Sequence, residues 1–225
     1  MTRYEYPIEM EIAGSTALFT RPDSGDSPTS YPAPTYSAVR AMFESILWGP
    51  AIEIVPKKVE ICAPIQWHAY CTNYGGPLRS SQQIKNGNNY QLYATVLIDV
   101  CYRLYAVARP TGQKTDLPQK AREWDRRTTA PGHAYQAMFF RRLERGQSFG
   151  SLCLGWKEFT PSYFGPFRKS TRVWEEMPDI LIPSMVRQVF ESSYNSGYHA
   201  VYDTNLVIHK GVLVYPERRV GGSDQ

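Results

Sequence analysis

Apolar residues recur at three- and four-residue steps between residues 35 and 47, a spacing that predicts an amphipathic helix. Thr35 can cap its first turn, and the Gly-Pro pair at 49–50 ends it. The apolar stripe consists of Ala38, Val39, Met42, Phe43, Ile46 and Leu47. A second helix is expected over residues 133–145, because Gly146 stops the helical pattern there.

Alternating apolar and polar residues predict strands between and around these helices. The first covers residues 4–13 and is expected to break at Gly14. The second covers residues 51–65, where Pro56 indicates two short strands or one bulged strand. The strongest signal lies in residues 90–109, which read as one long central strand or as a hairpin pair.

Polar, Gly-rich and Pro-rich composition marks two further segments. Residues 73–89 read as an exposed loop that could contact RNA or nothing, and residues 110–132 read as a mobile insertion. Beyond residue 160 we expect a short helix near residues 184–192. A hairpin follows, with strands at 205–208 and 212–215.

The expected fold class is α+β. The order strand, helix, strand, strand, helix, strand is that of ferredoxin-like and RNA-recognition-motif-like domains. We assign this domain to residues 1–159 and a small β-rich C-terminal subdomain to residues 160–225.

Composition narrows the cellular setting. The 225 residues, 42% of them hydrophobic, can bury one sizeable core. Apolar runs are too short to span a membrane, and the N-terminal residues lack the core of a signal peptide. The expected localisation is cytoplasmic, without a membrane partner.

Cysteine and histidine spacing favours neither a metal nor a cofactor. Cys62, Cys71, Cys101 and Cys153 contain no Cys-x-x-Cys pair, which argues against a zinc knuckle and a disulfide framework. They are expected to be buried or partly buried free thiols. His68, His199 and His209 have no partner at ligand spacing, so we predict no metal and no cofactor.

Positive charge is clustered along the chain. The net charge of +4 leans toward an anionic partner, and groups of arginines alternate with aromatic residues. This mixture suits single-stranded RNA, because arginine binds phosphates and aromatic rings stack on bases. The alternative is that the arginines line solvated helix faces while the aromatics are core. The candidate RNA contacts are Arg40, Arg126, Arg127, Arg141, Arg142 and Arg145.

Four motifs resemble one known family. Ala-Leu-Phe-Thr-Arg-Pro occupies 17–22, Ser-Tyr-Pro-Ala-Pro-Thr 30–35, Arg-Gly-Gln-Ser-Phe 145–149, and Leu-Gly-Trp-Lys-Glu-Phe 154–159. In this order and spacing they resemble the CRISPR-associated Cas-five family of subtype I-C. The resemblance covers about the first three quarters of the chain.

The resemblance implies a function in RNA processing. Members of the family cut CRISPR precursor RNA without a metal and then hold the 5′ handle of the guide within a surveillance complex. The implied partners are CRISPR RNA, through its repeat hairpin and 5′ handle, other Cas subunits and, through the complex, target DNA. Metal-free cleavage needs a base for the ribose 2′-hydroxyl, a cation near the phosphorane and an acid for the 5′-oxygen.

The catalytic residues of the family are not all matched. Members carry a tyrosine just before the Trp that ends the first helix, and a Lys-His pair that opens the second. The tyrosine position is Leu47 here, which cannot transfer a proton. An ungapped alignment places the Lys-His pair on Ala134 and Tyr135, and only a shift of register would match His133.

Three residues remain as catalytic candidates. His133 supplies an imidazole, whose ordinary pKa is near neutral, although a histidine at a helix start is more often a plain surface residue. Tyr135 could orient or donate through its hydroxyl. Lys157 stands where the family carries arginine and is preferred over Lys57 and Lys58 as the cation.

Three functions are therefore open. The chain is a metal-independent endoribonuclease that makes and keeps the guide, or a non-catalytic RNA-binding structural subunit of the same complex. Leu47 and Ala134 favour the second hypothesis. The third is an RNA-binding fold used outside CRISPR.

Overall fold

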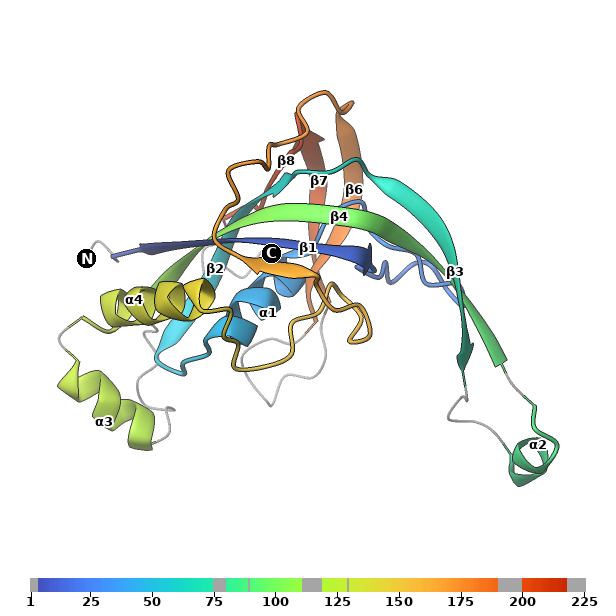
Figure 1. Ribbon diagram of the computed structural model, residues 1–225, viewed down its shortest axis with the longest axis horizontal. Helices are drawn as coiled ribbons and strands as arrows, with labels where there is room; N and C mark the ends of the chain where they lie inside the picture. Colours follow the sequence, from blue (N-terminus) through green and yellow to red (C-terminus); the bar gives the residue numbers. More distant parts are fainter. Residues whose placement is uncertain are drawn as a thin grey trace, which may run out of the picture.

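The chain is built around one curled antiparallel sheet, shown edge-on in Figure 1. The computed structural model describes residues 4–74, 80–88, 90–110, 119–128, 130–189 and 200–217. Its strands are β1 (Tyr6–Ala17), β2 (Ile52–Ile61), β3 (Gln66–Tyr74), β4 (Tyr90–Pro110), β5 (Tyr163–Gly165), β6 (Ile180–Gln188), β7 (Val201–His209) and β8 (Val212–Val214). Across the sheet the order is β5-β1-β4-β2-β8-β7-β6, and β3 pairs with β4. The structure is thus a mixed α+β fold.

Two helices cover one face of this sheet (Figure 1). Helix α1 (Tyr36–Ile46) contacts β2 and β6, and α4 (Pro131–Glu144) contacts β1 and β4. The predicted cap of α1 is confirmed, because the Thr35 hydroxyl accepts from the Ala38 amide at 3.2 Å. Two other helices, α2 (Ser81–Lys85) and α3 (Gln119–Arg127), lie in the segments predicted to be an exposed loop and a mobile insertion, respectively.

Strand β4 forms the centre of the fold. It is one continuous strand of 21 residues, which decides between the two interpretations of residues 90–109. β1 pairs with it from Tyr6 opposite Ala108 to Ala17 opposite Leu97. The predicted irregularity in β2 is confirmed as a shift of register between Pro56 and Lys58.

The core lies between the sheet and the two helices. Ile8, Met10 and Ile12 of β1 point toward the helices and are fully buried. Phe43 of α1 and Phe139 of α4 belong to the same core, and the centroids of their two rings lie 5.6 Å apart. The apolar faces that the helical and strand periodicities predict therefore pack together in one layer.

Two predictions about local structure are wrong. β1 does not break at Gly14 but continues to Ala17, because its pairing with β4 runs on from Gly14 opposite Val100 to Ala17 opposite Leu97. A Cβ at residue 14 would lie 2.5 Å from the Leu154 side chain. The glycine permits that close approach. The helix expected near residues 184–192 is instead the second half of β6, paired with β7, although residues 190–199 lie outside the described residues.

The segments past residue 159 join the same sheet. β5 pairs with β1 and β8 pairs with β2, so strands from both predicted domains are hydrogen-bonded to each other. The boundary between residues 159 and 160 stays a prediction. The C-terminal hairpin is confirmed, with Gly211 at a φ of +75° in its turn. Among the described residues, no helix is long and apolar enough to cross a membrane.

Candidate active site

The end of α1 is held by contacts from distant parts of the chain. A helix leaves its last carbonyl groups without intrahelical partners. Here Ser45 O accepts from the amides of Phe149 at 2.7 Å and Gly150 at 2.9 Å. Arg142 Nη1 donates to Ile46 O at 2.8 Å, and the Tyr135 hydroxyl donates to Leu47 O. We call this region, residues 45–49, 131–145 and 149–150, the helix corner.

Helix α4 positions several side chains of the helix corner. Tyr135, Phe139 and Leu143 recur every four residues and are all buried, so they form the stripe that faces the core. Tyr135 is 2% exposed, and burial raises the pKa of its hydroxyl. That hydroxyl is therefore a neutral donor, and its proton is directed to the Leu47 carbonyl.

His133 lies in the first turn of the same helix but points elsewhere. Its side chain is exposed, and its ring centroid lies 6.3 Å from that of Tyr6 at the start of β1. Gly132 allows this meeting, because a Cβ there would come within 2.3 Å of the Tyr6 ring. Residues two apart on a helix do not face each other, so His133 and Tyr135 do not act on one point.

Lys157 lies at the opposite end of β1 from His133. Its turn is fixed by the Leu18 amide, which donates to Leu154 O at 2.9 Å, and by Trp156 Nε1, which donates to Thr20 at 3.0 Å. A strand rises about 3.3 Å per residue, so the length of β1 separates the two regions by roughly 35 Å. The structure brings His133 and Tyr135 to the helix corner but not Lys157.

The candidate arginines have different surroundings. Arg40 forms an ion pair with Glu44 at 2.8 Å, and Arg142 donates a hydrogen bond to Ile46 O at the end of α1. Arg141 is exposed on the last turn of α4, and Arg145 is exposed directly after the helix ends. Arg127 is exposed at the end of α3, and the side chain of Arg126 lies outside the described residues. Their roles in binding RNA stay predictions.

The two other lysines considered as the cation are already paired. Lys57 contacts Glu217 and lies 3.5 Å from Glu5, and Lys58 pairs with Glu60 at 2.6 Å. Within the described part of the chain, no group of three or more His, Cys, Asp or Glu side chains could hold a metal ion. A reaction without a metal remains an expectation.

Two exposed aromatic residues at the corner were missed as candidates. Trp48 directly follows the capped end of α1 and is 52% exposed, and Phe149 is 72% exposed beside Ser45. Phe149 belongs to the motif at 145–149, and Trp48 matches the tryptophan that ends the first helix in the family, which was the available signal.

Comparison with known proteins assigns the family. The family model described as CRISPR-associated protein (Cas_Cas5) matches residues 8–220. This chain belongs to that family. The resemblance drawn from the four motifs is thereby confirmed.

Two relatives within the family are similar to most of the chain. CRISPR pre-crRNA endoribonuclease Cas5d of Mannheimia succiniciproducens is 31% identical over 172 residues, covering 70% of this chain and 71% of the relative. Cas5d of Thermus thermophilus, of the same description, is 29% identical over 162 residues, covering 71% of this chain and 63% of the relative. A crystal structure of a CRISPR-associated protein matches with a TM-score of 0.70 at 18% identity, covering 96% of this chain and 95% of that one, which supports the fold.

Proposed function

We propose that this chain is an endoribonuclease that cleaves CRISPR precursor RNA in its repeat without a metal and then holds the 5′ handle of the guide. The observation that carries the proposal is the 31% identity to a relative named as a pre-crRNA endoribonuclease. The helix corner supports it, because an exposed imidazole, exposed arginines and exposed aromatic rings lie on the same two helices or beside them.

The corner has the chemistry of a surface for single-stranded RNA. Trp48 and Phe149 offer rings on which unpaired bases can stack. Arg141 and Arg145 lie on the exposed side of α4, where guanidinium groups can bind phosphates in a bidentate manner. An RNA strand that stacks on the aromatic residues would bring its backbone along α4.

We assign His133 the proton transfer. Its imidazole takes the proton of the ribose 2′-hydroxyl, and the 2′-oxygen attacks phosphorus. The bond to the 5′-oxygen breaks, and this oxygen takes up a proton from water. The products are a 2′,3′-cyclic phosphate and a 5′-hydroxyl. Tyr135 serves as a positioning residue that fixes Leu47, because its hydroxyl is buried and already engaged. Lys157 contacts a more distant part of the RNA.

One experiment tests both the activity and the role of His133. The purified chain is incubated with its own repeat RNA in excess EDTA, and the products are resolved on a denaturing gel and tested for a cyclic phosphate. A single cut with a cyclic end is expected. His133→Ala should slow cleavage about 100-fold or more at saturating protein with nearly unchanged RNA affinity.

A control variant separates chemistry from general damage. His68 is an exposed histidine on β3, away from the helix corner, so His68→Ala should cleave like the natural chain. Equal loss of affinity and cleavage in His133→Ala would contradict proton transfer by this residue. Cleavage that stops in EDTA and returns with a divalent cation would contradict the metal-free reaction.

The alternative function is a non-catalytic RNA-binding structural subunit of the same complex. Leu47 favours it, because this position of the corner carries no group that can transfer a proton. Tight binding of the repeat RNA without a cut would establish this alternative. Both functions place the chain in a surveillance complex with other Cas subunits, in the cytoplasm, with access to target DNA through the complex.

We also infer that residues 1–159 form a ferredoxin-like domain. The elements β1, α1, β2, β4 and α4 lie within these residues, and β5 follows just past residue 159. Together they have the split βαβ order, and their strands are antiparallel neighbours in the order β5-β1-β4-β2. Both helices cover the same face (Figure 1). β3 extends this plan as an additional strand paired with β4.

A further inference from the structure

Two cysteines far apart in the sequence lie opposite each other in the sheet. Glu60 pairs with Arg103 and Ile61 with Tyr102, so Cys62, the next residue, faces Cys101. The Cys62 amide donates to Cys101 O at 2.8 Å, which confirms this register. Opposed residues that are hydrogen-bonded to each other in antiparallel strands have Cα atoms about 5.5 Å apart, inside the about 4.4–6.8 Å that a disulfide spans.

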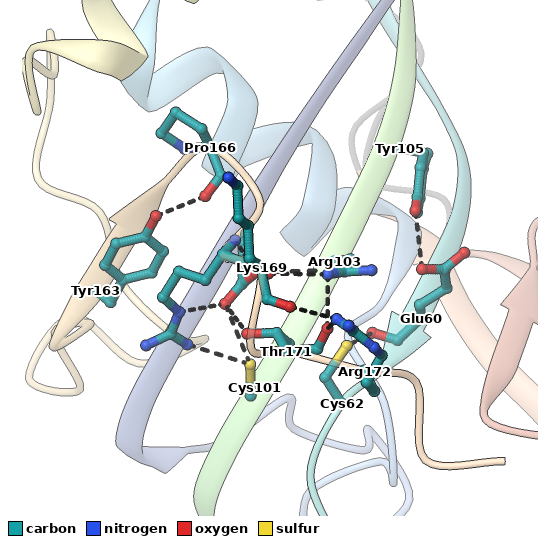
Figure 2. A network of polar contacts seen from close by, with 12 residues as sticks. Glu60, Cys62, Cys101, Arg103, Tyr105, Tyr163, Pro166, Lys169, Thr171 and Arg172 are labelled. Carbon is teal, nitrogen blue, oxygen red and sulfur yellow. Dashed lines mark hydrogen bonds and ion pairs between the residues drawn. The ribbon is translucent and has the colours of Figure 1, made fainter.

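Both thiols can be reached from solvent. Cys62 and Cys101 line the same open hollow of about 480 Å³, together with Arg168 and residues 170–174. Both are half-buried and neither is in a disulfide. Figure 2 shows Cys101 on β4 and Cys62, directly after the end of β2, near the segment that carries Thr171 and Arg172. A small oxidant that enters this hollow can therefore reach both cysteines.

The surroundings make the two thiols unequal. The interaction between the two neighbouring thiols lowers the pKa of Cys101 and raises that of Cys62. Arg168 Nη2 lies 3.6 Å from Cys101 Sγ and favours its thiolate, whereas the Glu11 carboxylate at 3.8 Å opposes it. Cys101 is therefore the nucleophile of the pair, and Cys62 is the thiol that resolves the product.

We propose that Cys62 and Cys101 form an oxidation site at which a peroxide produces an intramolecular disulfide between β2 and β4. The Cys101 thiolate attacks a peroxide oxygen, the O–O bond breaks, and a sulfenic acid and one water form. The Cys62 sulfur then attacks the sulfenic sulfur, the S–S bond forms, and the second water leaves. Two thiols are oxidised and one hydrogen peroxide is reduced, and a dithiol reductant reverses the reaction.

The test uses the full chain with Cys71 and Cys153 replaced by serine, which leaves only the proposed pair. After treatment with hydrogen peroxide under native conditions, both free thiols should disappear together, and peptide mapping should find residues 62 and 101 linked within one chain. Dithiothreitol should restore both thiols. The monomer should be lighter by two hydrogens, without added oxygen.

A matched variant and the natural chain complete the test. Adding Cys62→Ser to the same background should convert the product into sulfinic acid or an intermolecular dimer, because the resolving thiol is missing. The proposal is overturned if the two-cysteine chain itself gives those products or keeps both thiols free. If that chain does not fold, peptide mapping of the oxidised natural chain decides between the same outcomes.

Discussion

Replacing Tyr135 by phenylalanine separates a positioning role from a catalytic one. The change removes only the hydroxyl that donates to Leu47 O and keeps the buried ring beside Phe139. A carbonyl left without its partner costs about 1–3 kcal/mol when it is buried. Leu47 is only half-buried, so water can reach part of the corner, and we expect a loss of about 1 kcal/mol in the free energy of unfolding.

The expected loss is measurable by thermal and urea unfolding. For a chain of this length, about 1 kcal/mol corresponds to a melting temperature lower by about 2–4 °C. Single-turnover cleavage at saturating protein should change far less than the 100-fold or more that loss of a proton-transfer group costs. The small change expected reflects a corner that is slightly less well fixed.

Tyr93 offers the matched control. It is 57% exposed, and its hydroxyl donates to the exposed Gln91 side chain at 2.7 Å, so Tyr93→Phe should leave the free energy of unfolding within about 0.5 kcal/mol. If Tyr135→Phe abolished cleavage with unchanged stability, its hydroxyl would be a proton-transfer group. The positioning role assigned to Tyr135 would then be wrong.

Three further changes test other parts of the structure. Replacing Arg141 and Arg145 by alanine should weaken RNA binding and reduce the slope of log affinity against log salt by about 1.4, or about 0.7 for each phosphate that is no longer neutralised. Glu11 is fully buried, and although burial raises its pKa, hydrogen bonds from Thr171 and Arg168 lower it overall. The ionised carboxylate therefore stabilises the fold fully above its ordinary pKa, and this stabilisation is lost as the pH falls through the lowered pKa. Glu11→Gln should lower the free energy of unfolding by about 2 kcal/mol at neutral pH and make it fall less steeply in acid. Gly155→Ala should destabilise by about 1–3 kcal/mol, because its Cβ would lie 1.9 Å from Leu18 O.

Each of these changes has its own control. Arg21 is paired with Asp23 in the loop that follows β1, so Arg21→Ala should not alter the salt slope. Glu9 is exposed on β1, so Glu9→Gln should leave the loss of stability at low pH as it is in the natural chain. Gly87 also has a positive φ but nothing within 4 Å of a Cβ, so Gly87→Ala isolates backbone strain from the clash at residue 155. Equal effects in a variant and its control would refute the corresponding reasoning.

Local patterns in the sequence predicted the elements whose environment is local. The cap, stripe and end of α1 lie within fifteen residues, and the alternation in residues 90–109 matches a central strand that pairs with three others, β1, β2 and β3. β6 was missed because its short apolar stretch also fits a helical period, and pairing with β7 decided its conformation. Propensity was overridden there by a partner about twenty residues away in the chain.

The helix corner could be predicted only in part, because its contacts join distant segments. Arg142 was grouped with RNA-binding arginines from its neighbours in the sequence, yet its side chain is engaged by Ile46 O, 96 residues away. The motif at 145–149 gave no reason to place Phe149 beside Ser45 until the backbone hydrogen bonds did so. Interleaved arginines and aromatics indicate a surface, but tertiary contacts decide which of them remain available.

The geometry of α4 also bears on which residue replaces the family's Lys-His pair. An ungapped alignment puts the histidine position on Tyr135, but that side chain is buried and holds Leu47 in place. A histidine there would have to be buried as well, away from any RNA. His133 is exposed in the same first turn, so a shift of register is the arrangement that puts an imidazole on the surface. The helix face thus favours His133, and loss of cleavage in His133→Ala but not in Tyr135→Phe is the pattern that this assignment requires.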